Sequence, residues 1–69
     1  MLVSVEFHEK DKSISVKDID LSSEQTFALY NSKIIIFPHE KRGNVRGEIF
    51  KSIFSLGDKA CIVKIKEID

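Results

Sequence analysis

The chain has 69 residues, of which 42% are hydrophobic and 32% charged, and its eleven basic and eleven acidic side chains give a formal net charge of zero. These values are typical of one small globular domain over residues 1–69, and no apolar run approaches the roughly 18 residues that span a membrane. A neutral chain is also not expected to coat nucleic acid through bulk charge alone. The charge is unevenly spread, because residues 1–30 carry three lysines against six acids, whereas residues 31–69 carry eight basic side chains against five acids.

Cys61 is the only cysteine and lies within an apolar run. A single cysteine excludes an internal disulfide and a zinc site built from several cysteines, and a place in a strand core suits it better than a nucleophilic role. The N-terminus reaches Glu6 and His8 before a signal-peptide core can develop. We therefore expect a cytoplasmic protein. Because so short a chain buries only about 60% of its surface on folding, we also expect it to associate as a homodimer.

The start of the chain predicts a β-hairpin. Residues 2–8 alternate between apolar and polar side chains, which is the pattern of a half-buried strand. Residues 13–17 alternate again and place Ile14 and Val16 on the same side. The polar residues 9–12 form the turn, although no Asn-Gly or Asp-Gly pair fixes its type.

The segment 18–31 is compatible with two structures. Ser22, followed three residues later by Gln25, forms a capping box and favours a short helix over about 23–31. The aromatic and β-branched residues of the same segment instead favour a strand that pairs with residues 33–37 as a second hairpin. We favour the helix, because capping depends on position whereas β propensity is easily overridden.

Residues 33–37, with the sequence KIIIF, predict a buried strand. Four consecutive apolar residues, three of them β-branched, precede Pro38, which cannot donate to a sheet ladder. Residues 39–43 then form a charged turn.

The predicted main helix covers about 44–56 and is amphipathic. At 3.6 residues per turn its apolar side chains occupy about half of the circumference. Asn44 can cap its start and Gly57 its end, and residues 59–68 alternate as a final strand. The predicted class is therefore α+β: one small sheet with an N-terminal hairpin and a C-terminal strand, and this helix across one face.

Charged residues around the start of this helix form a candidate nucleic-acid-binding site. A helix N-terminus exposes unpaired N–H groups and a partial positive charge, so arginine is unusual there. Arg42 and Arg46 flank Asn44, and with the free amides they make a seat for a phosphate or carboxylate. The predicted binding residues are His39, Lys41, Arg42, Arg46 and Lys51. The alternative for Arg46 is an ion pair with a carboxylate such as Glu48.

A family resemblance rests on this segment. Residues 46–53, RGEIFKSI, are similar to the Arg-x-Glu-Ile-aromatic-x-x-Ile segment that opens the C-terminal helix of the carbon storage regulator family, small dimeric RNA-binding translational repressors. Three further stretches fall in a compatible order, namely residues 1–3, 13–19 and 34–38. The resemblance covers residues 1–54. It implies that Arg46 contacts RNA and that two chains intertwine, and it favours the second hairpin over the short helix.

No pattern in the chain predicts catalysis. His8 and His39 stand outside any metal or acid–base motif, and the segment 43–47 lacks the Lys-Ser/Thr pair of a phosphate loop. We therefore expect a non-enzymatic binding module without a metal or other cofactor, whose ligand is RNA or another nucleic acid. The alternative is a protein-binding module, such as an inhibitor or accessory subunit, with Phe50 and Phe54 at the partner interface.

Overall fold

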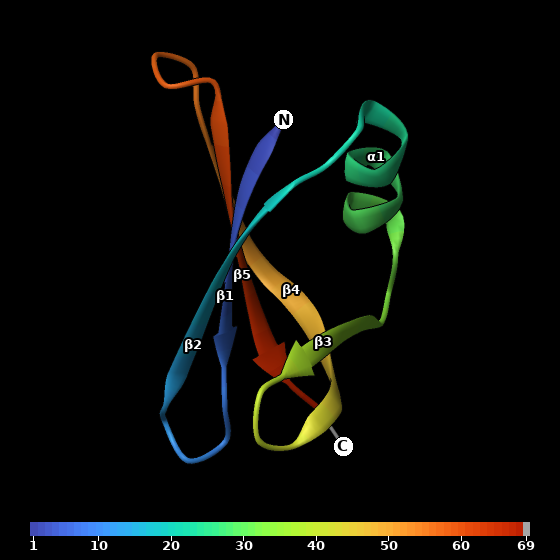
Figure 1. Ribbon diagram of the computed structural model, residues 1–69, viewed down its shortest axis with the longest axis vertical. Coiled ribbons are helices and arrows are strands. Elements are labelled where there is room, and N and C mark those ends of the chain that lie inside the picture. The colour runs from blue at the N-terminus through green and yellow to red at the C-terminus, as the bar shows by residue number, and fades with distance from the viewer. Residues whose placement is uncertain (69) are drawn as a thin grey trace.

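The computed structural model describes residues 1–68, which form five strands and one helix (Figure 1). The elements in chain order are β1 (Leu2–His8), β2 (Ile14–Asp20), α1 (Ser23–Asn31), β3 (Ile35–His39), β4 (Gly43–Ser55) and β5 (Ala60–Glu67). The strands form one sheet in the order β2-β1-β5-β4-β3. The α+β class with a single small sheet is confirmed, as are the N-terminal hairpin and the final strand.

The centre of the sheet is the parallel pair β1 and β5, and the other neighbouring strands are antiparallel. This pair supplies six of the eight buried hydrophobic residues in the described part of the chain: Val3, Val5, Phe7, Cys61, Val63 and Ile65. Phe37 of β3 and Val45 of β4 supply the other two. The core therefore lies on one face of the sheet, where period-two alternation places the apolar side chains of both central strands.

The sheet is curled around this core. The rings of Phe7 on β1 and Phe37 on β3 stack with their centroids 4.8 Å apart. In a flat sheet these strands would stand three positions apart, or about 14 Å. The stacked rings therefore require the two lateral edges of the sheet to bend toward each other. We call the inner side, which carries Phe7 and Ile65, the concave face, and the outer side, which carries Glu6 and Lys64, the convex face.

Gly47 on β4 allows the tightest packing at the curl. A β-carbon at this position would lie 2.8 Å from the carbonyl oxygen of Lys66 and 2.9 Å from Cε1 of Phe7, and closer still to Ile65. These distances are shorter than van der Waals contact, so the sheet can approach this closely only because residue 47 has no side chain.

Helix α1 confirms the capping box, and the second-hairpin alternative for this segment is wrong. The Ser22 hydroxyl accepts from the Gln25 N–H at 3.1 Å, and the Gln25 side chain accepts from the Ser22 N–H at 3.0 Å. Leu21 and Leu29 pack against the core, and Figure 1 shows α1 beside the upper end of the sheet. No helix within residues 1–68 is long and apolar enough to span a membrane.

The predicted helix over 44–56 is wrong, because these residues form most of the long strand β4. Residues four apart, such as Val45 and Ile49, share a face in a helix and also in a strand, so their spacing fits both periods. A bulge between Ile49 and Lys51 then shifts the alternation, which hides the period of two. Strand β3 pairs with the first part of β4, as far as Gly47, and β5 pairs with the rest, and this pairing outweighs any helical tendency.

Candidate functional site

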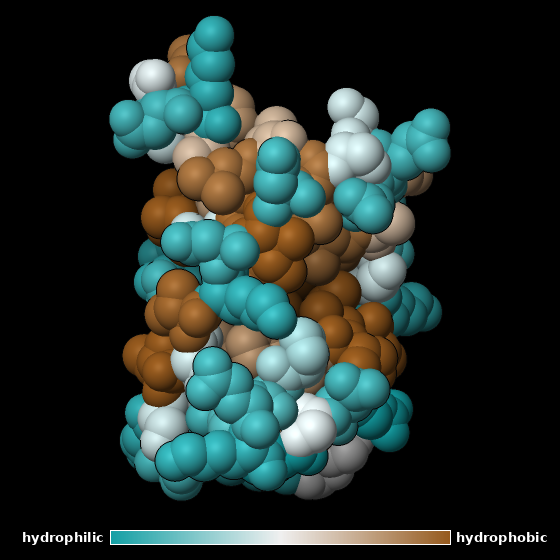
Figure 2. All heavy atoms as spheres, viewed as in Figure 1, coloured by the Kyte–Doolittle hydropathy of each residue, from teal (hydrophilic) through white to brown (hydrophobic). Residues whose placement is uncertain are grey.

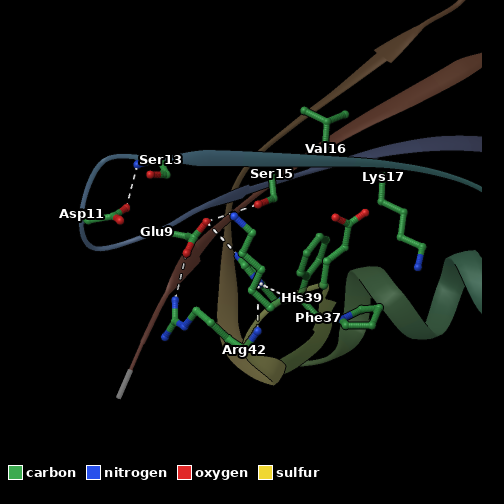
Figure 3. Close-up of a pocket in the computed structure, with 12 residues that line it drawn as sticks. Glu9, Asp11, Ser13, Ser15, Val16, Lys17, Phe37, His39 and Arg42 are labelled. Atoms are coloured by element: carbon green, nitrogen blue, oxygen red, sulfur yellow. Dashed lines mark hydrogen bonds and ion pairs between the residues drawn. The ribbon is translucent and has the colours of Figure 1, made fainter.

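A cluster of polar and charged side chains closes the lower end of the concave face, between the turns that join β1 to β2 and β3 to β4 (Figure 3). Glu9 accepts hydrogen bonds from Arg42 Nη1 at 3.0 Å, His39 Nε2 at 3.1 Å and Ser15 Oγ at 3.2 Å. Glu67 accepts two from the Arg42 guanidinium, at 2.9 and 2.5 Å. The two glutamate side chains are each only 9% exposed. We call these five residues the Glu9 cluster.

Strand alternation and register bring the two glutamates together. Glu9 lies one residue beyond the end of β1, at the next inward position after Phe7, and Glu67 is the last residue of β5, at the next inward position after Ile65. The two strands are parallel and pair Phe7 with Ile65. The inward-facing side chains that follow Phe7 and Ile65 therefore lie next to each other at the same end of the strands. Arg42 approaches from the β3–β4 turn and bridges both carboxylates.

His39 has both ring nitrogens engaged. Its Nδ1 accepts the backbone N–H groups of Lys41 at 3.1 Å and Arg42 at 3.3 Å, so the hydrogen-bond network assigns the proton to Nε2, which donates to Glu9. A ring held in this way offers no free lone pair to a substrate or a metal ion. His39 therefore orders the β3–β4 turn and is not placed to act as a general base.

The charges of the cluster stabilise one another. The Arg42 guanidinium holds the pKa of Glu67 at about 2. The hydrogen bond from His39, and then that from Arg42, lowers the pKa of Glu9, while the carboxylates of Glu67 and Glu9 raise the pKa of Arg42. Both carboxylates and the guanidinium are therefore ionised near neutral pH, which leaves a net negative charge at the cluster.

Two adjoining cavities open between the edge strands β2 and β3. The first, of about 650 Å³, lies beside the Glu9 cluster between residues 13–17 and residues 37–42. The second, of about 320 Å³, lies beneath α1 and is mainly apolar. Phe37 and Pro38 line both cavities, so the two adjoin at these residues, and Figure 2 shows hydrophobic surface exposed on this side of the molecule. We call the combined space the interstrand groove.

The five residues predicted to bind nucleic acid divide between two places. His39, Lys41 and Arg42 lie at the β3–β4 turn, whereas Arg46 and Lys51 lie on β4. Arg46 stands opposite Ile36, and Lys51 stands opposite Lys64 on the convex face. The helix N-terminus that was expected to seat an anion does not exist, because residue 44 is within β4. Contact of these residues with nucleic acid stays a prediction.

Phe50 and Phe54, the predicted partner interface, lie on opposite faces of the sheet. Phe50 is on the convex face, where its ring meets His8 edge-on with the centroids 5.0 Å apart. Phe54 stands opposite Cys61 and therefore belongs to the concave face. Both rings are about half exposed. The homodimer stays a prediction too.

The sequence reasoning missed Glu9 and Glu67 as partners of Arg42. A signal was present, because each glutamate occupies the next inward position of an alternating strand, where a charged residue must find a partner. The missing information was the parallel pairing of β1 with β5, which no local pattern reveals.

No protein-family model, curated protein or solved structure matches this chain. The resemblance to the carbon storage regulator family therefore remains a prediction, and residues 46–53, which carry it, form part of a strand. Within residues 1–68, no group of three or more His, Cys, Asp or Glu side chains is arranged to hold a metal ion.

Proposed function

We propose that the chain is a non-enzymatic protein-binding module. The observation that carries this proposal is the balance between exposed and buried apolar side chains. Among residues 1–68, twelve large hydrophobic side chains are at least 38% exposed, whereas only eight hydrophobic residues are buried. Single exposed apolar residues are ordinary, but several that adjoin one another mark an interaction site, and Ile53, Phe54 and Leu56 are neighbours in the chain.

The β4–β5 hairpin is the strongest candidate for the contact surface. It projects beyond the rest of the sheet at the upper end of the molecule (Figure 1). Ile53, Phe54 and Leu56 are 40%, 51% and 79% exposed there. Because Ile53 and Phe54 point to opposite faces, the hairpin offers apolar side chains on both sides. Large apolar anchors of this kind contribute most of the binding energy at protein interfaces.

Nucleic-acid binding, the function expected from the sequence, has less support. The guanidinium of Arg42 is engaged by two carboxylates, and the cluster around it is net negative. Arg46 and Lys51 make no ion pair in the described part of the chain, but on the convex face two other lysines are paired with glutamates. This leaves too few free cations in one place to bind a phosphate backbone strongly.

Site-specific photocrosslinking tests the proposal, with the labelled variants expressed in the cells in which the chain naturally occurs. A benzoyl-phenylalanine in place of Phe54 is expected to give a discrete protein adduct, while the same group in place of Glu24, on the exposed surface of α1, gives none. In parallel, the absorbance ratio of the purified protein is measured before and after a high-salt wash. RNA that is released by salt, together with no adduct at position 54, would overturn the proposal in favour of nucleic acid.

A further inference from the structure

The hydrogen-bond register of β2 leaves a set of backbone groups without partners in the sheet. In an antiparallel pair, every second residue bonds across the ladder, and the groups of the residues between them point away. The Glu9 N–H donates to the Ser13 carbonyl at 2.8 Å, and at the other end the Leu21 N–H donates to the Met1 carbonyl at 2.8 Å. Both bonds join odd-numbered residues, so the even-numbered residues of β2 direct their N–H and C=O groups away from β1.

One of these residues, Val16, reaches the interstrand groove. Val16 lines the larger cavity, yet Figure 3 shows its side chain pointing away from that space. The main chain of Val16 is therefore the part that reaches the groove. The same register gives Asp18 the same orientation, so two N–H and two C=O groups of β2 are available to another strand.

Two side chains of β2 beside this edge, one basic and one apolar, face the concave side of the sheet. Lys17 stands opposite Val5 and so belongs to the concave face, and it lines the larger cavity together with Phe37 and Glu40. Lys17 makes no ion pair within residues 1–68, although the carboxylate of Glu40 lines the same cavity. Two residues further on, Ile19 lines the apolar cavity beneath α1. A basic side chain and an apolar one are therefore spaced at the period of a strand.

We propose that the interstrand groove binds an extended peptide segment of the partner protein, which adds to the β2 edge as a further strand. An acidic side chain of the peptide lies opposite Lys17, and an apolar side chain two residues away lies opposite Ile19. This inference rests on the proposed protein-binding function and states its mode. Main-chain hydrogen bonds to Val16 and Asp18 supply affinity, and the alternate side chains supply specificity. Cavities of about 650 and 320 Å³ are within the size range of binding pockets in proteins.

Charge argues against a second copy of the chain as the occupant. If β2 pairs antiparallel along its whole length with β2 of another copy, Lys17 lies directly opposite Lys17. Like charges in that position are destabilising, and an inward-pointing lysine is one of the devices that protect edge strands from self-association. The opposite edge is limited as well, because Pro38 of β3 has no N–H to donate. The same lysine that repels a copy attracts an acidic peptide.

Fluorescence anisotropy with the full chain and short labelled peptides tests the proposal. The host peptide is seven residues of alternating Thr and Val with capped termini, and it carries Glu and Leu two residues apart, in either order. Of these two peptides, the one that binds gives the strand direction. Replacing its Glu by Lys is expected to weaken binding roughly fivefold to tenfold. N-methylation of the peptide amides that face Val16 and Asp18 is expected to abolish binding, because it removes main-chain donors.

Variants of β2 provide the complementary test. Lys17→Glu is expected to reverse the preference, so that the Lys-containing peptide binds better than the Glu-containing one. Val16→Pro removes an N–H that makes no bond to β1, so the fold is retained while binding falls about fivefold or more. Val16→Thr keeps the N–H and the β-branched shape and is expected to bind as the native chain does. If Val16→Pro unfolds, the charge reversal at position 17 still decides the matter.

The outcomes separate this inference from the proposed function. Slower amide exchange at Val16 and Asp18 on addition of the peptide supports strand addition. Binding that ignores the charge at position 17 and tolerates N-methylation overturns it, as does a dimer in sedimentation equilibrium that is lost in Val16→Pro. Saturation of the groove by single-stranded RNA in place of peptide also overturns it. A protein adduct at position 54 without any peptide binding leaves the protein-binding function standing and this inference wrong.

Discussion

At the scale of single residues, Gly47 shows most directly how sequence limits structure. Its missing side chain lets β4 approach Phe7 and Ile65, and a β-carbon there would force one of them to move. Gly47→Ala is therefore expected to lower the free energy of unfolding by about 1–3 kcal/mol, the usual cost of overpacking. Urea denaturation measures the change. The matched control is Gly57→Ala, which meets no atom within 4 Å and should change little; equal losses at both positions would contradict the explanation.

Two lysines occupy a backbone conformation that favours glycine. Lys12 in the β1–β2 turn has φ = 77°, and Lys59 in the β4–β5 turn has φ = 53°. Lys12→Gly is expected to raise the free energy of unfolding by about 0.5–1 kcal/mol, because glycine adopts this conformation without steric strain. Thermal unfolding measures the shift. Lys41→Gly, in a turn at a residue without positive φ, is the control and should be destabilising; a loss of stability in Lys12→Gly would refute the argument.

At the scale of elements, two short local signals predicted the right element and two other patterns did not. The buried strand expected over residues 33–37 is instead the edge strand β3, Ile35–His39, which includes Pro38 and buries only Phe37. The capping box at Ser22 and the alternation of residues 2–8 each depend on neighbouring residues, and both predicted the element that forms. In β4, Gly47 and Ser52 occupy concave-face positions without apolar side chains, and the bulge near residue 50 changes the phase. The alternation of apolar and polar side chains in β4 is therefore hidden, and the spacing of four residues between its apolar side chains predicts a helix instead.

The stability of α1 depends on its cap. Its side chains are all at least partly exposed, so packing contributes less than usual and the Ser22 hydrogen bonds contribute more. Ser22→Ala is expected to cost about 1 kcal/mol, while Ser22→Asp should be nearly neutral because aspartate also accepts at an N-cap. Circular dichroism and urea denaturation measure the loss. Ser23→Ala, at the first helical residue, is the control; an equal cost at both serines would exclude a specific capping effect.

At the scale of the whole molecule, the arrangement depends on contacts between distant parts of the chain. The parallel pairing of β1 with β5 joins the two ends of the sequence, and it places Glu9 and Glu67 together. No local pattern encodes that pairing, so the site expected from sequence was centred on Arg42 and Arg46 as anion receptors. The structure instead gives Arg42 two carboxylate partners and leaves Arg46 exposed on β4. The same type of side chain thus has a structural role at position 42, whereas at position 46 it makes no ion pair within residues 1–68.

Arg42 joins three distant segments, so the cluster should make the stability of the whole molecule depend on pH. The folded pKa of Glu67 is about 2, below its ordinary value of 4.5, and that of Glu9 is lowered as well. A carboxyl group with a depressed folded pKa stabilises the fold above its unfolded pKa, and this contribution is lost as the pH falls toward the folded value. Arg42→Met removes the guanidinium. The variant is therefore expected to have a lower free energy of unfolding than the native chain at pH 7, and this difference in free energy is expected to shrink between pH 4.5 and 2.

Urea denaturation at intervals from pH 2 to 7 measures this profile. Arg46→Met is the matched control, since it removes an exposed arginine that makes no ion pair in the described residues, and it should follow the native profile at a nearly constant offset. Added salt should weaken part of the Arg42 effect, because the guanidinium side chain is 42% exposed while the two glutamate side chains are 9% exposed. If the Arg42→Met difference stayed constant down to pH 2, the ion pairs would not be the bonds that hold the lower end of the sheet closed.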